Sequence, residues 1–191
     1  MHYLIIHSHP REDSLNASIR DTILNNLATR NEETKTIDLY ADNYDPVLRP
    51  DSRKSLARTP PTPRTEEYRQ LLLDAHTIIC IHPTWWGRPP AIFLGFCDQV
   101  FGAGFAYEKS RKTQLPKPFL RGKRAYVITT LGGPPLVSRL FTGDAHRILL
   151  KRLLFAFCGI KPTRFLEVYS AETMTMQRFT QLEKKIGKFI R

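Results

Sequence analysis

Three short segments of this sequence carry residues suited to binding a flat, anionic ligand. In the first, residues 9–16 (HPREDSLN), Ser14 stands just before an apolar repeat and is a candidate helix N-cap. The free amides and dipole of a helix N-terminus favour an anion such as phosphate. Asp13 would repel a phosphate, and Arg11 would offset that repulsion. The segment lacks the Gly-x-Gly-x-x-Gly and Walker patterns, so a different phosphate cradle is implied, unless Ser14 only caps the helix.

The second segment, residues 83–90 (PTWWGRPP), places two tryptophans in a turn bounded by prolines. Their flat apolar faces are costly to leave in water unless a partner packs on them. Such faces suit an aromatic ring system such as isoalloxazine. The alternative is a tryptophan pair buried in a core or a subunit interface.

The third segment, residues 129–135 (TTLGGPP), has two glycines directly after a β-branched run. Glycines at such a point let the backbone approach a ligand and direct its amides toward it. Gly132-Gly133 alone is only a turn signal. Three such segments that meet at one edge of a sheet are a stronger indication of a binding site.

The elements that must position these segments alternate along the chain. Apolar runs and β-branched stretches predict strands, and apolar residues that recur every three or four positions predict helices. The predicted strands are residues 2–7, 34–39, 77–82, 123–130 and 164–169, and the predicted helices are residues 15–27, 64–76, 91–101, 143–157 and a C-terminal stripe at residues 176–189. The connections at residues 40–63, 102–122 and 131–142 are predicted to be irregular.

Strict alternation of strands and helices predicts the α/β class, with a doubly wound, five-stranded parallel sheet covered by helices on both faces. Doubly wound sheets bind ligands outside the carboxyl ends of their strands, at a topological switch point. The three segments all lie at such strand ends. The length of 191 residues fits a single domain over residues 1–191.

Composition limits the class of protein further. Apolar residues make up 41% and charged residues 25%, as in soluble globular proteins. Cys80, Cys97 and Cys158 are few, widely spaced and set among apolar neighbours, so we expect reduced core thiols and neither disulfides nor a metal site. The sequence has no signal-peptide pattern and no apolar run long enough to span a membrane, which predicts a cytoplasmic protein without an integral membrane segment.

The formal net charge of +11 raises the question of an anionic partner. No helix-turn-helix, zinc-finger or ribonucleoprotein motif accompanies the charge, so we do not expect a nucleic acid. Solvated faces that also attract anionic cofactors are the simpler interpretation. The basic residues are dispersed over three regions: Arg49, Arg53, Lys54, Arg58 and Arg64 in one loop, residues 109–123 in another, and Lys184, Lys185, Lys188 and Arg191 on the last helix.

The motifs at these positions carry a family resemblance. The chain resembles the NAD(P)H:quinone oxidoreductase family of flavodoxin-like proteins, which includes drug-activity modulators and ancillary reductases of potassium efflux systems. The resemblance covers about residues 3–170 and rests on HP and SLNA (9–10, 14–17), DLY and DPVL (38–40, 45–48), PTWW and PAI (83–86, 90–92), Gly95, DQVF and GFAY (98–101, 104–107), LRGK (120–123), TT (129–130) and FCG (157–159).

The resemblance implies a strand order of 2-1-3-4-5 and a bound flavin. It also implies a role for each segment. The flavin phosphate would be held by His9, Ser14, Leu15 and Asn16, the isoalloxazine edge by Pro83, Thr84, Trp85, Trp86 and Gly87, and the pyrimidine side by Thr130, Leu131, Gly132 and Gly133.

By the same resemblance the protein would be an enzyme that passes a hydride from NAD(P)H to the flavin and two electrons on to a quinone or similar aromatic acceptor. FMN is preferred to FAD because the chain is short and shows no evident adenine-binding extension. A homodimer is implied, because a second chain completes the site in these families. The alternative is a flavin-bearing ancillary subunit with little turnover, whose basic surface would make peripheral contact with a membrane protein. A plain electron-carrier flavodoxin is disfavoured, since such carriers tend to be acidic.

The sequence departs from the family pattern in the third segment. Some relatives relay protons through a Tyr and a His there, but residues 136–142 (LVSRLFT) contain neither. His146 comes later, on the predicted helix. Leu131 also interrupts the usual Thr-Thr-Gly-Gly run. The acceptor and the efficiency could therefore differ, and no catalytic side chain is predicted.

Overall fold

A computed structural model of the protein describes residues 2–49, 60–110 and 115–191. Five parallel strands form one sheet in the order β2-β1-β3-β6-β7. Counted as the five strands of the main sheet, this is the predicted order 2-1-3-4-5. The strands are β1 (His2–His7), β2 (Glu33–Asp38), β3 (Thr77–Pro83), β6 (Arg124–Thr130) and β7 (Thr163–Val168).

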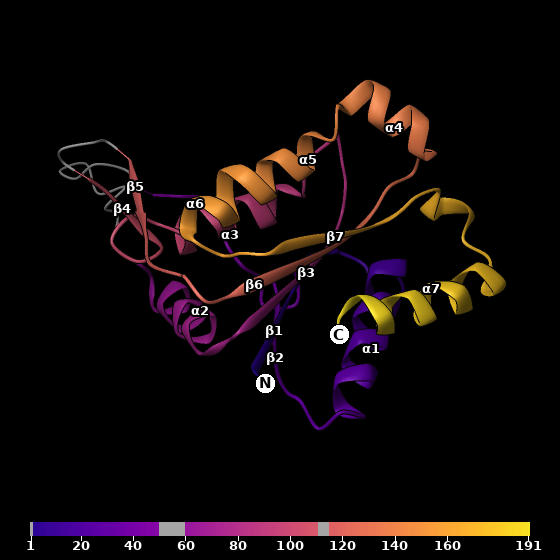
Figure 1. The fold of residues 1–191 in the computed structure, drawn as a ribbon, viewed down its shortest axis with the longest axis horizontal. Coiled ribbons are helices and arrows are strands. Elements are labelled where there is room, and N and C mark those ends of the chain that lie inside the picture. Colours follow the sequence, from indigo (N-terminus) through magenta and orange to yellow (C-terminus); the bar gives the residue numbers. More distant parts are fainter. Residues whose placement is uncertain (1, 50–59, 111–114) are drawn as a thin grey trace.

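Helices cover both faces of this sheet (Figure 1). One face packs against α1 (Leu15–Ala28) and α7 (Met176–Phe189), and the other packs against α2 (Pro63–Asp74), α3 (Ala91–Val100) and the helical stretch that precedes β7. Neighbouring residues of one strand serve opposite cores, because side chains alternate across a strand. Leu4 and Ile6 enter the core beneath α2 and α3, whereas Tyr3 and Ile5 enter the core beneath α1 and α7.

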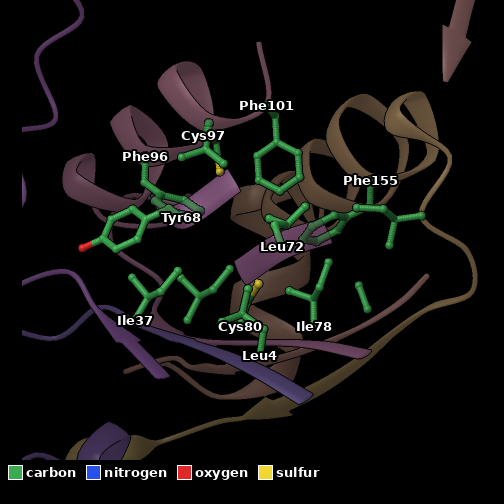
Figure 2. Packing of buried hydrophobic residues seen from close by; sticks show 14 of the residues in the cluster. Leu4, Ile37, Tyr68, Leu72, Ile78, Cys80, Phe96, Cys97, Phe101 and Phe155 are labelled. Carbon is green, nitrogen blue, oxygen red and sulfur yellow. The ribbon is translucent and has the colours of Figure 1, made fainter. Parts of the chain in front are cut away.

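The core beneath α2 and α3 is rich in aromatic rings (Figure 2). Tyr68, Phe96 and Phe101 pack edge-on or tilted, with ring centroids about 6 Å apart. Cys80 and Cys97 lie in this same core, and Cys158 closes it near β6. All three thiols are buried and free, which confirms the prediction of reduced core cysteines.

Local signals in the sequence set the helix starts. Ser14 Oγ accepts a hydrogen bond from the amide of Ala17 and so caps α1, as predicted. Thr62 caps α2 in the same way, and Pro63 occupies the first helical position, where its missing N–H is not needed. Thr175 Oγ1 caps α7.

The prediction of an irregular loop at residues 131–142 was wrong for its second half. Residues Pro135–Thr142 form a helix, α4, which begins with proline at its first position and ends at Gly143, whose φ is +56°. Its apolar residues repeat at helical spacing. Leu136, Val137 and Leu140 are exposed, so they gave no buried face from which to recognise the helix.

The predicted helix at residues 143–157 starts later and is not uniform. It consists of α5 (Ala145–Ile148), a π-helical stretch η2 (Leu149–Phe155) and α6 (Ala156–Cys158), and it ends at Gly159 with φ +90°. The predicted irregular stretch at residues 102–122 contains a small antiparallel pair, β4 (Tyr107–Lys109) with β5 (Pro116–Pro118). A short 3₁₀ turn, η3 (Ala171–Thr173), follows β7.

Part of the long connection at residues 40–63 cannot be compared with its prediction. The basic residues Arg53, Lys54 and Arg58 predicted in that loop lie outside the described residues. Among the residues that are described, no helix is both long and apolar enough to cross a membrane. Nor do the described His, Cys, Asp and Glu side chains form a cluster that would hold a metal ion.

Candidate functional site

A cavity of about 500 Å³ opens at the carboxyl edge of the sheet. The three segments singled out in the sequence all contribute to it, because β1, β3 and β6 are neighbours in the sheet and end at the same edge. Its size lies in the range of small-molecule and cofactor pockets. The lining residues are His9, Leu15, Asn16, Pro83, Thr84, Trp85, Trp86, Thr130, Leu131, Gly132, Ala171 and Glu172.

The first segment brings the amino end of α1 to this cavity. Asn16 is buried, and its Nδ2 donates to Thr130 Oγ1 at 2.9 Å, so the amide ties α1 to the end of β6. Its Oδ1 is also buried and has no hydrogen-bond partner among the described residues. Buried polar atoms are seldom left so, and a bound ligand or water is the ordinary remedy. The site is therefore incomplete without a hydrogen-bond donor.

The charges of the first segment are arranged as the sequence predicted. Arg11 donates to both carboxylate oxygens of Asp13, at 2.9 and 2.8 Å. This pairing lowers the pKa of Asp13 and offsets its charge at the mouth of the site. Partial burial lowers the pKa of His9, whose Nδ1 accepts from the amide of Arg11 at 3.1 Å, so its ring is neutral at pH 7.

The tryptophan turn is held in an unusual conformation. The amide of Trp85 donates to the Arg88 carbonyl at 2.9 Å, and the amide of Arg88 donates back at 3.1 Å. Trp86 and Gly87 at the tip have φ of +52° and +71°. A left-handed conformation is unfavourable for a residue as bulky as tryptophan, and such strain is typical of ligand-binding sites. The side chain of Trp86 is 96% exposed and that of Trp85 41%, so neither belongs to the core.

The third segment forms the opposite wall. The amide of Thr84 donates to the Thr130 carbonyl at 2.8 Å and joins the second segment to the third. Leu131 is buried, and its backbone is held by hydrogen bonds to Val168 and Ala171 at 2.9 and 3.0 Å. It therefore acts as a structural anchor at the place where the sequence departs from the family pattern.

Two lining residues were missed from the sequence, Ala171 and Glu172 in η3. Glu172 extends toward the third segment, since a Cβ on Gly132 would lie 3.2 Å from its Oε1. Both residues closely follow a predicted strand at the same sheet edge, a signal that could have found them. Conversely, Ser14, Gly87 and Gly133 are close in the chain but are not among the lining residues.

The chain matches the family described as "Flavodoxin-like fold" over residues 1–190. It is 30% identical over 115 residues to "Uncharacterized NAD(P)H oxidoreductase YcaK" of Escherichia coli (strain K12), with 59% of each chain covered. It is 26% identical to "NAD(P)H dehydrogenase [quinone] 1" of Cavia porcellus, covering 83% of this chain and 64% of the relative. The matched part thus spans less than two thirds of either relative.

Solved structures show the same fold over nearly the whole chain. Smu.1420 from Streptococcus mutans UA159 is 34% identical, with a TM-score of 0.86 and coverage of 98% of this chain and 97% of that one. An FMN-dependent NADH-azoreductase from Bacillus anthracis, solved in complex with FMN, is 19% identical, with a TM-score of 0.76 over 98% and 97% of the two chains.

Proposed function

We infer the function of this chain from its sheet-edge cavity and from its family, since over residues 1–190 it belongs to the flavodoxin-like fold family. The protein is a flavin-dependent oxidoreductase that takes electrons from NAD(P)H and passes them to a quinone or similar aromatic acceptor. One observation carries this proposal: three segments distant in the chain meet at one cavity of about 500 Å³, beside the amino end of a helix and two partly exposed tryptophans.

The proposed flavin contacts are those implied by the family resemblance, and all of them except Ser14, Gly87 and Gly133 line the cavity. His9, Ser14, Leu15 and Asn16 surround the amino end of α1, where amides and the helix dipole favour the phosphate. The unpartnered Asn16 Oδ1 can accept only from a hydroxyl or N–H of the flavin, because an ionised phosphate has no hydrogen to donate. The rest of the assignment is Pro83, Thr84, Trp85, Trp86 and Gly87 along the ring edge and Thr130, Leu131, Gly132 and Gly133 at the pyrimidine side.

The flavin, when bound, supplies hydride and electron transfer. The chain supplies orientation and electrostatics. The backbone amides of Trp86 and of Gly132-Gly133 stabilise negative charge on the ring. Trp86 provides a flat surface at the mouth of the cavity for the nicotinamide and then for the acceptor. FMN is the proposed flavin, and the azoreductase of the same fold was solved in complex with FMN.

Absorbance and turnover test this proposal together. The purified protein is reconstituted with FMN or with FAD, and the oxidation of NADPH and NADH is followed with menadione as acceptor. We expect a flavin spectrum with FMN and acceptor-dependent oxidation. Absence of both after reconstitution would refute the proposal. Oxidoreductases are named among the relatives, so the ancillary-subunit alternative is not favoured.

A homodimer is part of the same proposal. Helix α4 stands apart from the helices that cover the sheet (Figure 1), and Leu136 and Leu140 on it are 70% and 74% exposed. A second copy of the chain that covered α4 and Trp86 would remove this apolar surface from water. The protein is proposed to act in the cytoplasm. Contact with a membrane protein stays a prediction from the resemblance.

Light scattering after gel filtration tests the dimer. We expect a mass near twice 22.1 kDa for the wild type and a shift toward the monomer for Leu136→Ser with Leu140→Ser. The control is Met176→Ser on α7, an equally exposed apolar residue away from α4. A monomeric wild-type protein would contradict this part of the proposal.

A further inference from the structure

A row of buried polar side chains crosses the sheet beside the cavity. His82 of β3 is paired in register with Thr129 of β6, and Thr129 is paired with Glu167 of β7. Side chains of paired residues in neighbouring parallel strands lie on the same face, with the strands about 4.8 Å apart. His146 of α5 joins the row from the helical layer, because its Nε2 lies 3.0 Å from Glu167 Oε1. These four residues are called the polar row below.

The two ends of the polar row reach two different cavities. At one end, Thr129 Oγ1 lies 2.6 Å from the Oγ1 of Thr84, which lines the candidate site. At the other end, Glu167 Oε2 accepts from the Tyr169 hydroxyl at 2.8 Å and from Arg147 Nη1 at 3.3 Å. Glu167, Tyr169 and Arg147 line a second cavity of about 500 Å³ at the outer edge of the sheet. By strand register the row therefore extends across the sheet from that edge to the neighbour of Thr84 at the candidate site.

Hydrogen bonding decides which imidazole nitrogens carry protons. His82 Nδ1 lies 3.0 Å from the Pro83 carbonyl oxygen and 3.4 Å from Thr129 Oγ1. A carbonyl can only accept, so Nδ1 is protonated and Nε2 is a bare acceptor. By the same reasoning the Glu167 carboxylate accepts from Nε2–H of His146.

One nitrogen of each imidazole ring, that of His82 and that of His146, still lacks a hydrogen-bond partner. His82 Nε2 and His146 Nδ1 are both buried and have no hydrogen-bond partner within the described chain. A proton on His146 Nδ1, donated to His82 Nε2 directly or through one buried water, satisfies both nitrogens at once. The arrangement then places an imidazolium at His146, against the carboxylate of Glu167.

The charges around the rings agree with this protonation. Burial lowers the pKa of His82 to about 4, and a charge on His146 lowers it further, so His82 is neutral at pH 7. The hydrogen bond from His146 lowers the pKa of Glu167, which remains anionic. Phe93 of α3 packs on the His82 ring, and Phe165 packs on that of His146. The other titratable groups at this end of the row are Asp144, Arg147 and Tyr169, with Arg139 of α4 acting on Tyr169.

We propose that the polar row conducts a proton from the outer cavity to the candidate site. This inference rests on the proposed function, because the reduction of a quinone by NAD(P)H consumes one proton from water besides the hydride. His146 Nδ1 gives its proton to His82 Nε2, and His82 Nδ1 gives its own to Thr129 Oγ1. The Thr129 hydroxyl proton moves to Thr84 Oγ1, whose own proton goes to the acceptor oxygen. These transfers leave each ring with its single proton on Nε2 and a bare Nδ1. Both rings then turn over, so that the bare nitrogen of His146 faces Glu167 and that of His82 faces His146. His146 takes up the next proton on that bare nitrogen from water of the outer cavity, past Glu167.

The proposal accounts for a departure noted in the sequence. Residues 136–142 contain no Tyr or His that could transfer a proton at the cavity. The polar row supplies titratable groups from the strands and from α5 instead. None of its four residues lines the candidate site, but Thr84, hydrogen-bonded to Thr129, does, so the two histidines act through the threonine hydroxyls.

Nuclear magnetic resonance of the imidazole nitrogens tests the protonation without any flavin. In the cofactor-free protein we expect His146 to be doubly protonated at pH 7 and His82 to be neutral with its proton on Nδ1. Glu167→Gln removes the carboxylate that accepts from Nε2–H, so we expect only one of the two His146 nitrogens to carry a proton at pH 7 in that variant. A neutral His146 at pH 7 in the wild type, or His146 nitrogen resonances that Glu167→Gln leaves unchanged, would overturn the proposal.

Half-reactions then test proton delivery. His146→Gln keeps an N–H donor for Glu167 but cannot carry a proton. We expect it to slow reoxidation of the reduced protein by menadione at least about tenfold, with a larger solvent isotope effect, and to leave reduction by NAD(P)H unchanged. The control is His76→Gln, an exposed histidine just before β3, which should change neither step.

The outcomes separate the two proposals. If His146→Gln slows both half-reactions equally, or neither, the proton path is wrong although the flavin function stands. If the protein binds no flavin, the proposed function fails and the proton has no destination, while the resonance experiment still decides the His146–Glu167 pair. Should His146→Gln fail to fold, the imidazole nitrogen resonances of the wild type and of Glu167→Gln remain decisive.

Discussion

Replacement of Gly95 by alanine is expected to destabilise the protein, although Gly95 lies within helix α3. A Cβ built at this position would lie 2.3 Å from the Pro46 carbonyl oxygen, 2.5 Å from Pro46 Cβ and 2.7 Å from Pro46 Cα. Non-bonded heavy atoms rest at about 3.5–4.0 Å, so the Pro46 backbone would have to retreat by roughly 1 Å. That backbone is tied to α3, because Gln99 Nε2 donates to the Asp45 carbonyl at 2.8 Å.

Two opposing effects set the magnitude. Alanine in place of glycine inside a helix gains about 1 kcal/mol of helix propensity. Overpacking a well-packed contact costs about 1–3 kcal/mol, and a clash with backbone atoms belongs at the upper end of that range. The expected net loss in the free energy of unfolding is therefore about 2 kcal/mol. For a chain of this size the loss corresponds to a fall in Tm of about 4–8 °C.

Thermal and urea unfolding followed by circular dichroism measure this loss. Gly133→Ala is the matched control, because a Cβ at Gly133 meets no described heavy atom within 4 Å and its φ is not positive. We expect the control to stay within about 0.5 kcal/mol of the wild type. A Gly95→Ala protein as stable as the wild type, or more stable, would refute the reasoning about the Pro46 contact.

Three further predictions concern single side chains. Trp86→Ala should change the free energy of unfolding by less than about 0.5 kcal/mol, since the ring is exposed. It should raise the Kd for FMN at least about tenfold, and an unchanged Kd in a fluorescence titration would argue against a role of the tryptophan turn in binding FMN. The pKa of Glu167 is lower in the folded protein than in the unfolded chain, so ionised Glu167 stabilises the fold at pH values above its unfolded pKa. This contribution is lost as the pH falls through its folded pKa. Glu167→Gln should therefore flatten the decline in urea midpoints between about pH 5 and pH 3, and an equally steep decline would count against the His146 bond. Burial raises the pKa of all three cysteine thiols, that of Cys158 to about 12. A thiol reagent should therefore react with them only after the protein unfolds, and rapid reaction with the native protein would contradict the prediction.

Several features of the protein were determined by local sequence. Buried parallel strands are apolar on both faces, so runs such as residues 77–82 predicted strands within one or two residues of their ends. Ser14 predicted the start of α1, because a capping hydroxyl satisfies amides only a few residues away. The three site segments could be found because each directly follows such a strand, and parallel strands end at a common edge. The strand order came from the family resemblance rather than from any local pattern.

Other features were decided only by tertiary structure. Helix α4 was taken for a loop because Leu136, Val137 and Leu140 are exposed, so their spacing marked no buried face. Ala171 and Glu172 reach the cavity because the end of β7 lies beside the end of β6. The register between β3, β6 and β7 alone places His82, Thr129 and Glu167 in one row, and α5 then adds His146. Such contacts depend on the pairing of residues tens of positions apart, and no local pattern carries that information.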